Sequence, residues 1–402
     1  YASTPTISGT FTTATQAATL EFGSANPVIN VSGLSPMGLI ISAAITQNAA
    51  HTGPISKTGN GSLIMSSGSG RWTSGLALNE GTLVIASVSG PSTASTVAAP
   101  VALTFGPLGL GTLTIATGTT VQSDASARTV SNPINFATPS VASTFTVGGT
   151  AATHNLTLNG VVDLGSANRT IIVSSPQVTA TIGGQVTGSG GLTKSGNGIL
   201  VLSQVANDYA GGTNISAGLL RLGAAGVIPA ASALTINAGA ALDLNSFNFD
   251  LTTRTVSGSG FITNSATTGT VTLTMGGATN SVFSGGITNN VGSTLALTKQ
   301  GVGSLTLNGP NSYTGATLVS GGTLSAAAGS LASPRRAYSN DSPLAILPRG
   351  AARRTSPFRS PVPCSSPVSL DRAGAWKCRN KKAPPRTWSS RSTSPSRCSS
   401  PT

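Results

Sequence analysis

The first 331 residues contain no cysteine, few charged or aromatic side chains, and no long apolar run. Only 8% of the whole chain is charged, whereas ordinary globular proteins have about 25%. A region without thiols cannot form wrong disulfides in an oxidising compartment, which suits secretion. The most apolar stretch, GLIISAAI at residues 38–45, is too short to cross a bilayer, so we expect no transmembrane segment. The start at Tyr1, without an apolar leader, is interpreted as a mature or fragment end.

The residues that most enzymes need are also scarce. Residues 1–331 hold seven dispersed acidic residues and only two histidines, His51 and His154, with no metal-type spacing around them. Asp163 and Asp243 lie in VDL and LDL strand patterns, where a solvent-facing carboxylate is expected. We expect the two histidines to be solvated or in turns. The motifs G-x-S-x-G, G-x-x-x-x-G-K-[ST] and GGxGxD do not occur. The prediction is therefore a protein that is not an enzyme, with no catalytic residue, no cofactor and no metal.

What the chain has in abundance is glycine, 50 residues of it, together with Ser, Thr, Asn and Ala. Ser, Thr, Asn and Gly favour turns and extended backbone over helix. This composition favours many short strands joined by tight turns.

Three segments of the chain align with one another, beginning KTGNGSLIM, KSGNGILVL and KQGVGSLTL. In each, a lysine precedes a leucine by six residues, an aromatic follows, and an aliphatic residue comes six residues after the aromatic. The corresponding residues are Lys57, Leu63, Trp72 and Leu78; Lys194, Leu200, Tyr209 and Ile215; and Lys299, Leu305, Tyr313 and Val319. Matching offsets in three copies indicate an internal structural repeat.

Each copy is predicted to form three short strands whose apolar residues alternate with polar ones. This period of two places Leu63, Leu200 and Leu305 on an inward face. One such coil cannot bury its apolar face, whereas stacked coils bury a continuous column. We therefore predict an all-β, parallel solenoid from about residue 30 to 331. At roughly 20–25 residues per coil, it would contain about 13–16 coils.

The other recurring residues are interpreted as structural. Lys57, Lys194 and Lys299 are predicted to be solvated turn residues that discourage stacking between rods. The glycines of the repeated G-x-G pattern are predicted to be turn residues. Trp72, Tyr209 and Tyr313 are expected to pack over a corner of the coil, with sugar stacking as the alternative.

The three copies resemble the passenger-associated transport repeat, also called the autotransporter-associated β-strand repeat. The resemblance is close at GLTKSGNGILVLSQVANDYAGGTNISAGLLRLG and at ALTKQGVGSLTLNGPNSYTGATLVSGGTL. It is weaker in the first copy, where Trp72 replaces Tyr and Arg71 replaces Asn or Asp. What the resemblance implies is a right-handed parallel β-helix that is exported and displayed on a bacterial surface. The sequence shows no translocator barrel.

The composition changes after Leu331, which suggests two domains. We predict a β-helix passenger over 1–331, with repeats near 55–87, 190–224 and 295–328, and a disordered basic C-terminal tail over 332–402. The tail has 14 basic and two acidic residues, and it holds all three cysteines, Cys364, Cys378 and Cys398. A shifted reading frame is the favoured interpretation of the tail. A natural disordered tail and a polyanion-binding module are the alternatives.

The sequence as a whole predicts the structural stalk of a secreted or surface-displayed autotransporter-like protein, adhesin-like and without catalysis. The alternative is a carbohydrate-binding or carbohydrate-cleaving β-helix. Expected partners are cell-surface glycans or other cells, and an outer-membrane translocator during export. No nucleic acid is expected, and the rod is expected to be monomeric. The expected location is extracellular or on the bacterial cell surface.

Overall fold

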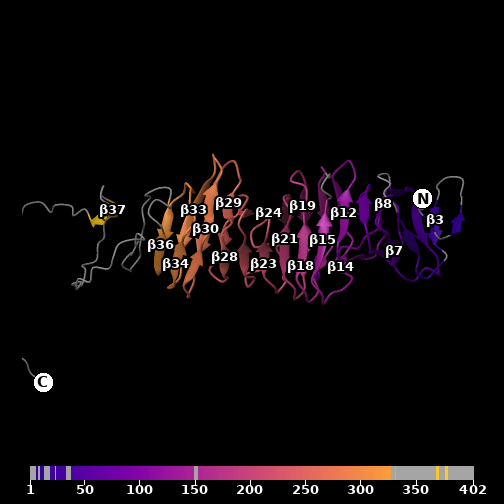
Figure 1. Cartoon of the computed structure of the whole chain (residues 1–402), viewed down its shortest axis with the longest axis horizontal. Helices are drawn as coiled ribbons and strands as arrows, with labels where there is room; N and C mark the ends of the chain where they lie inside the picture. The colour runs from indigo at the N-terminus through magenta and orange to yellow at the C-terminus, as the bar shows by residue number, and fades with distance from the viewer. Residues whose placement is uncertain are drawn as a thin grey trace, which may run out of the picture. The chain divides into compact units, whose positions relative to one another are not determined.

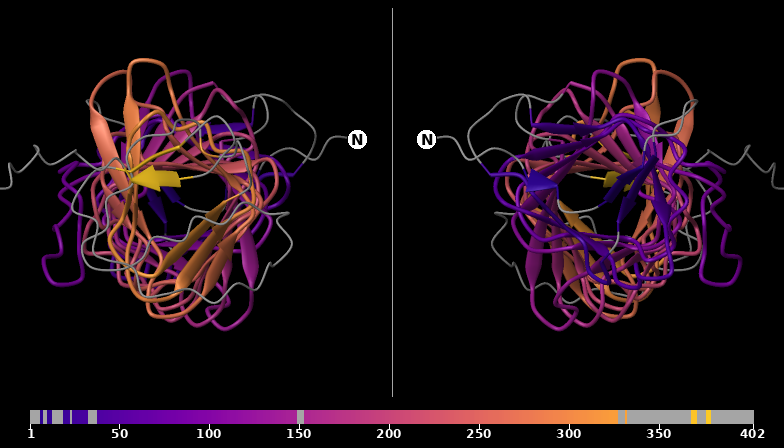
Figure 2. Two further views of the ribbon diagram at one scale, coloured as in Figure 1. Left: turned by 90° about the vertical axis from the view of Figure 1, so that its left-hand side faces the viewer. Right: turned by 90° about the vertical axis from the view of Figure 1, so that its right-hand side faces the viewer.

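The computed structural model describes residues 6–7, 10–12, 19–22, 24–32, 38–148, 153–326, 331, 368–370 and 376–378. Two compact units divide the chain, at residues 1–353 and 354–402. The first unit is a parallel β-solenoid of about 12 turns, as the sequence predicts. From β3 to β36, each pair of laddered strands is parallel. Figure 1 shows these strands stacked one behind another, and Figure 2 looks along the stack, where successive coils overlie one another.

One long sheet runs through the first half of the solenoid. Its eight strands, in order, are β1 (Thr6–Ile7), β4 (Val28–Asn30), β7 (Ile55–Thr58), β9 (Leu76–Leu78), β11 (Leu113–Ile115), β14 (Ile134–Phe136), β17 (Val162–Asp163) and β20 (Val186–Thr187).

A second sheet has ten strands and continues further along the stack. They are β5 (Leu39–Ile41), β8 (Ser62–Met65), β10 (Thr82–Ile85), β12 (Thr119–Ser123), β15 (Ser143–Val147), β18 (Arg169–Ile172), β21 (Leu192–Ser195), β23 (Thr213–Ile215), β25 (Leu234–Ile236) and β28 (Val256–Gly258).

The third long sheet begins later along the chain. It contains β13 (Arg128–Val130), β16 (Leu156–Leu158), β19 (Thr179–Ile182), β22 (Ile199–Leu202), β24 (Gly218–Leu222), β26 (Ala240–Asp243), β29 (Phe261–Asn264) and β32 (Gly286–Asn289).

Three shorter sheets complete the solenoid at its two ends. The first is β2 (Thr10–Thr12), β3 (Thr19–Phe22) and β6 (Ala44–Gln47). The second is β27 (Phe249–Asp250), β30 (Thr270–Met275), β33 (Thr294–Lys299) and β35 (Thr317–Val319). The third is β31 (Ser281–Phe283), β34 (Ser304–Leu307) and β36 (Thr323–Ala326).

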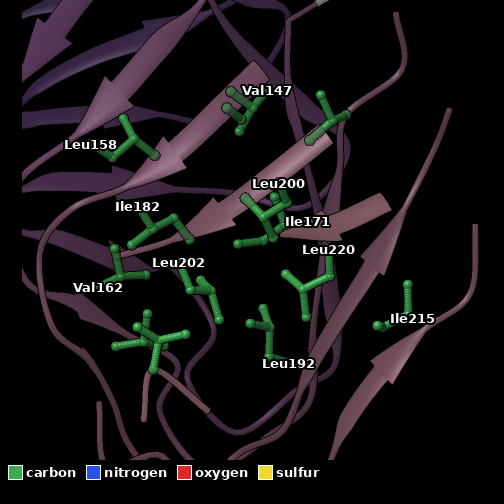
Figure 3. Close-up of a cluster of buried hydrophobic side chains, with 14 of the residues drawn as sticks. Val147, Leu158, Val162, Ile171, Ile182, Leu192, Leu200, Leu202, Ile215 and Leu220 are labelled. Carbon is green, nitrogen blue, oxygen red and sulfur yellow. The ribbon is translucent and has the colours of Figure 1, made fainter. Parts of the chain in front are cut away.

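The core is the column of side chains that alternation directs inward. Leu63, Leu200 and Leu305 are fully buried, which confirms their predicted inward positions. Each lies in register with a leucine of the next coil: Leu63 with Leu83, Leu200 with Leu220, and Leu305 with Leu324. Figure 3 shows part of this column, in which aliphatic side chains from neighbouring coils point toward one another. Stacking of like residues removes apolar surface from water at every coil.

The prediction of about 13–16 coils was slightly too high, because one long segment leaves the coil path. Residues 86–112 connect β10 to β11 and form antiparallel bridges at Gly70–Gly106 and Gly90–Phe105. Ser95 in this segment bonds through its backbone to Asn159 and Gln185, which belong to later coils. The segment therefore lies along several coils and adds residues without adding a coil.

The tail predictions mostly concern residues outside those that the structure describes. Within 332–402, the structure describes two short strands, β37 (Val368–Leu370) and β38 (Trp376–Cys378), which pair antiparallel. The predicted disorder and the shifted reading frame both fall on the undescribed part.

Candidate functional site: a buried lysine in each repeat

Each repeat forms four strands in two successive coils, and the prediction of three strands per copy was wrong. The second repeat consists of β21 and β22 in one coil, with β23 and β24 stacked directly on them. The first repeat pairs β7 with β9 and β8 with β10, and the third pairs β33 with β35 and β34 with β36. The additional strand in each repeat is the one that carries the lysine, namely Lys57, Lys194 or Lys299.

These lysines are buried, so the prediction of solvated turn positions was wrong. Lys57, Lys194 and Lys299 each have 0% of their surface exposed. Each lies two residues after an inward aliphatic residue on the same strand, as Lys194 does after Leu192. The strand period of two therefore directs the lysine stem into the core. There it lies in register with an aliphatic residue of the next coil, such as Ile215 for Lys194.

The ammonium group of each lysine donates hydrogen bonds to three backbone carbonyls. Lys194 Nζ donates to the carbonyl oxygens of Ser195 at 2.9 Å, Gly196 at 2.7 Å and Ala217 at 3.0 Å. Two acceptors belong to the turn that follows the lysine, and the third belongs to the next coil. An ammonium group has three donors and no acceptor, so this arrangement satisfies it completely.

The other two repeats reproduce this geometry. Lys57 Nζ donates to Thr58 at 3.0 Å, Gly59 at 2.5 Å and Glu80 at 2.9 Å. Lys299 Nζ donates to Gln300 at 2.8 Å, Gly301 at 2.8 Å and Gly321 at 3.1 Å. The lysine strand of the first repeat, β7, lies in the eight-stranded sheet that runs from β1 to β20. The lysine strand of the second repeat, β21, lies in the ten-stranded sheet. The lysine arrangement is thus a local property of two stacked coils and does not depend on which sheet they enter.

Glycines make room for the carbonyls around the ammonium group. Gly196 follows the lysine by two residues and has φ of 74°, a conformation that is inexpensive for glycine alone. In the next coil, a Cβ on Gly218 would lie 2.3 Å from the Gly196 oxygen and 2.9 Å from Lys194 Nζ. The prediction that the glycines of the G-x-G pattern are turn residues is confirmed. Gly218, which begins β24, must be glycine for a different reason, because any side chain there would collide with the Gly196 carbonyl and the Lys194 ammonium group.

Burial changes the acidity of these groups. Desolvation lowers the pKa of Lys57 and of Lys194 to about 8, and it also lowers the pKa of Lys299. In the first repeat, the charge of Glu80 raises the pKa of Lys57 and so offsets part of the effect. A lysine of lowered pKa can act as a nucleophile. Here, however, Nζ is covered and hydrogen-bonded to main chain, so the geometry serves to tie one coil to the next.

The aromatic residue of each repeat is also buried, as predicted. Tyr209 and Tyr313 are 1% and 2% exposed, and each hydroxyl lies 2.7 Å from a threonine hydroxyl four residues later. Trp72 donates from Nε1 to the Gly75 carbonyl at 3.1 Å. Desolvation raises the pKa of Tyr209 to about 12. Because these rings have no exposed face, the alternative of sugar stacking on them is wrong.

The remaining residues singled out from the sequence do not form one site. Asp243 is buried rather than solvent-facing, because it accepts a hydrogen bond from Arg221 Nε at 2.7 Å and others from Asn245 and Ser265. Asp163 is half-buried and accepts a bond from the Gly165 amide.

The histidines are likewise separate from each other and from these acids. His51 is buried rather than solvated, but it closes a turn as predicted, since its amide donates to the Asn48 carbonyl at 3.1 Å; its Nε2 lies 3.0 Å from the Ser74 hydroxyl. Its burial lowers its pKa. His154 is half-buried beside Thr153. Among the residues described by the structure, no group of three or more His, Cys, Asp or Glu side chains could hold a metal ion. The same residues include no helix that is long and apolar enough to cross a membrane.

Comparison with known proteins agrees with the repeat geometry. The family described as passenger-associated-transport-repeat matches residues 55–85, 192–222 and 297–326, which contain the four strands of each repeat. A segment of 158 residues is 39% identical to "Adhesin BmaC autotransporter" of Brucella suis biovar 1 (strain 1330). That match covers 38% of this chain and 4% of the relative, so the chain spans a small part of that protein.

No solved structure matches the chain. In the structure, successive coils pair in parallel, and each repeat places one lysine between two coils. The chain is an autotransporter passenger-like β-solenoid that carries three passenger-associated transport repeats and is related to an autotransporter adhesin.

Proposed function

We propose that this chain is a structural stalk of a secreted or surface-displayed protein, which holds an adhesive region away from the cell and performs no catalysis. The observation that carries the proposal is the repeated two-coil unit, in which a buried lysine joins the main chain of both coils. A column of aliphatic residues supports the same stack. Such a stack gains stability coil by coil, since each repeat contacts its neighbours.

The absence of cysteine from the solenoid supports the same proposal. Residues 1–331 lack cysteine, so disulfides do not need to form or be avoided in an oxidising compartment. We propose domain limits of 1–331 for the passenger and 332–402 for a separate tail, an outer-membrane translocator as the partner in export, and cell-surface glycans or other cells as adhesion partners. The adhesive role is proposed from the similarity to an autotransporter adhesin, of which this chain covers 4%.

The test is display on a Gram-negative host. The full chain, joined to a heterologous signal peptide and an outer-membrane translocator, should become accessible to external antibody and should be retained as a folded, protease-resistant passenger. A matched chain carrying both Lys194→Met and Lys299→Met should be exported but cleaved by external protease, because two coil-to-coil ties are lost. Antibody accessibility and protease resistance are read by flow cytometry and immunoblot. Retention of the unmodified chain in the periplasm would contradict the proposal.

A further inference from the structure

Arg254 has fewer hydrogen-bond acceptors around it than the fully buried Arg169. Arg169 is fully buried and donates to backbone carbonyls and to a hydroxyl of Ser143 at 2.6 Å. Arg254 is half-buried, and its two terminal nitrogens each reach only the Ile228 carbonyl, at 3.4 Å. Its Nε is buried without a hydrogen-bond partner. Within the described ranges, no carboxylate forms an ion pair with Arg254. A guanidinium with so few acceptors retains donors for an anion.

Arg254 lies where the stacking of the sheets is interrupted. The ten-stranded sheet ends at β28, and the strand beside it in the next coil, β31, begins a different sheet. The residues around this interruption line a pocket of about 240 Å³. Arg254 contributes from the segment before β28, and Ser281 contributes from β31. The interruption therefore opens a recess in the surface of the solenoid.

The lining of the pocket combines one positive charge with neutral hydrogen-bonding groups and an apolar floor. The Ser281 hydroxyl is buried without a hydrogen-bond partner. Other polar lining residues are Thr252, Thr255, Thr279 and Asn280. Apolar lining residues are Val256, Met275, Phe283 and Leu305, the last from the third repeat. Small-ligand sites have this character, with a few polar groups set in an apolar surface.

We propose that this pocket binds a single acidic sugar, such as a uronic acid at the end of a glycan. Arg254 would bind the carboxylate, and the exposed lining residues Thr255, Thr279 and Asn280 would bind the sugar hydroxyls. The volume is below the roughly 300–1,000 Å³ typical of drug-sized ligands, which favours one sugar ring over a longer chain. This inference adds a ligand to the proposed stalk and does not depend on surface display.

The experiment uses the purified full chain and methyl β-glucuronide as probe, with saturation-transfer NMR and calorimetry. We expect binding that weakens at least tenfold in Arg254→Gln and is unchanged in Arg71→Gln, since Arg71 is exposed in the first repeat. Thr279→Trp is a second variant, because Thr279 is an exposed lining residue whose enlargement obstructs the pocket while leaving Arg254 in place. It should also abolish binding. Thermal melts of each variant report whether it folds.

Three results would overturn the inference. Absence of glucuronide binding to the unmodified chain removes the site. Equal affinity for methyl β-glucoside removes the role of the Arg254 charge. Equal affinity for acetate removes the sugar, because it shows that the carboxylate alone is recognised. Each result concerns the purified chain, so none of them bears on whether the solenoid is exported and displayed.

Discussion

Leu200→Asp should lower the free energy of unfolding by several kcal/mol. Leu200 has no exposed surface, and its register partners in the adjacent coils are Ala180 and Leu220. A carboxylate there would be enclosed by aliphatic side chains without a donor, which is among the most destabilising kinds of substitution. The side chains around this position are visible in Figure 3. Urea unfolding followed by circular dichroism measures the change.

The control for Leu200→Asp is the same substitution one residue further along the strand. Val201 faces outward, in register with Arg221. Val201→Asp should change stability by less than about 1 kcal/mol, since strand propensities span about that range. If the two substitutions had equal effects, Leu200 could not be part of the core column.

Lys194→Met should also be strongly destabilising, by about 2–4 kcal/mol. Methionine retains an apolar stem of similar length, so the packing against Ile215 survives. The carbonyls of Ser195, Gly196 and Ala217 lose their shared donor. Ser195 still accepts from the Val173 amide, whereas a buried polar group that is left unpaired costs about 1–3 kcal/mol. Removal of a buried charge offsets part of this loss. Replacement of a solvated lysine would instead have a negligible effect on stability.

Thr193→Met serves as the matched control for Lys194→Met. Thr193 precedes the lysine on the same strand and is directed to the opposite face. Its replacement should shift stability by less than about 0.5 kcal/mol, as surface substitutions usually do. Paired melts of the two variants compare the two faces of one strand. A Lys194→Met chain as stable as the Thr193→Met chain would show that the carbonyl contacts contribute nothing.

The fold could be predicted from the sequence because its signals are local and repeated. Alternation around Leu63, Leu200 and Leu305 assigns an inward face, and identical offsets in three copies require equivalent positions. The same alternation also contains the signal for the lysines. Leu192 and Lys194 are two residues apart, so a strand that buries the first must direct the second inward. A prediction that weighs the charge of the lysine above this periodicity places the side chain in solvent and misses the fourth strand of each repeat.

Other features could not be predicted from the sequence, because they depend on which strands become neighbours. Asp243 is buried because Arg221, 22 residues earlier, lies beside it in the adjacent coil. The pocket at Arg254 exists because pairing is interrupted between β28 and β31. Neither strand carries a local pattern that would reveal the interruption. Coil-to-coil register, unlike alternation within a strand, is a property of the folded chain.

The lowered lysine pKa values have a consequence for stability. In the unfolded chain a lysine titrates near pH 10.4, whereas Lys194 in the folded chain titrates at about 8. Between these values the unfolded state binds more protons, so the free energy of unfolding rises with pH, by at most about 1.4 kcal/mol per pH unit for each such lysine. Above about pH 10 the raised pKa of Tyr209 acts in the opposite direction, because the folded state then keeps its proton longer.

The most direct test of the buried lysine tie is an NMR titration of the lysine Nζ and Cε resonances in the full chain. Lys57, Lys194 and Lys299 are assigned by replacing each with methionine in turn. We expect midpoints of about pH 8 for Lys57 and Lys194, and a midpoint below the ordinary value for Lys299. The same resonances should return to about pH 10.4 in urea. Midpoints near 10.4 for all three lysines in the folded chain would contradict this expectation, because burial between the coils would then not disfavour the charged form of these lysines.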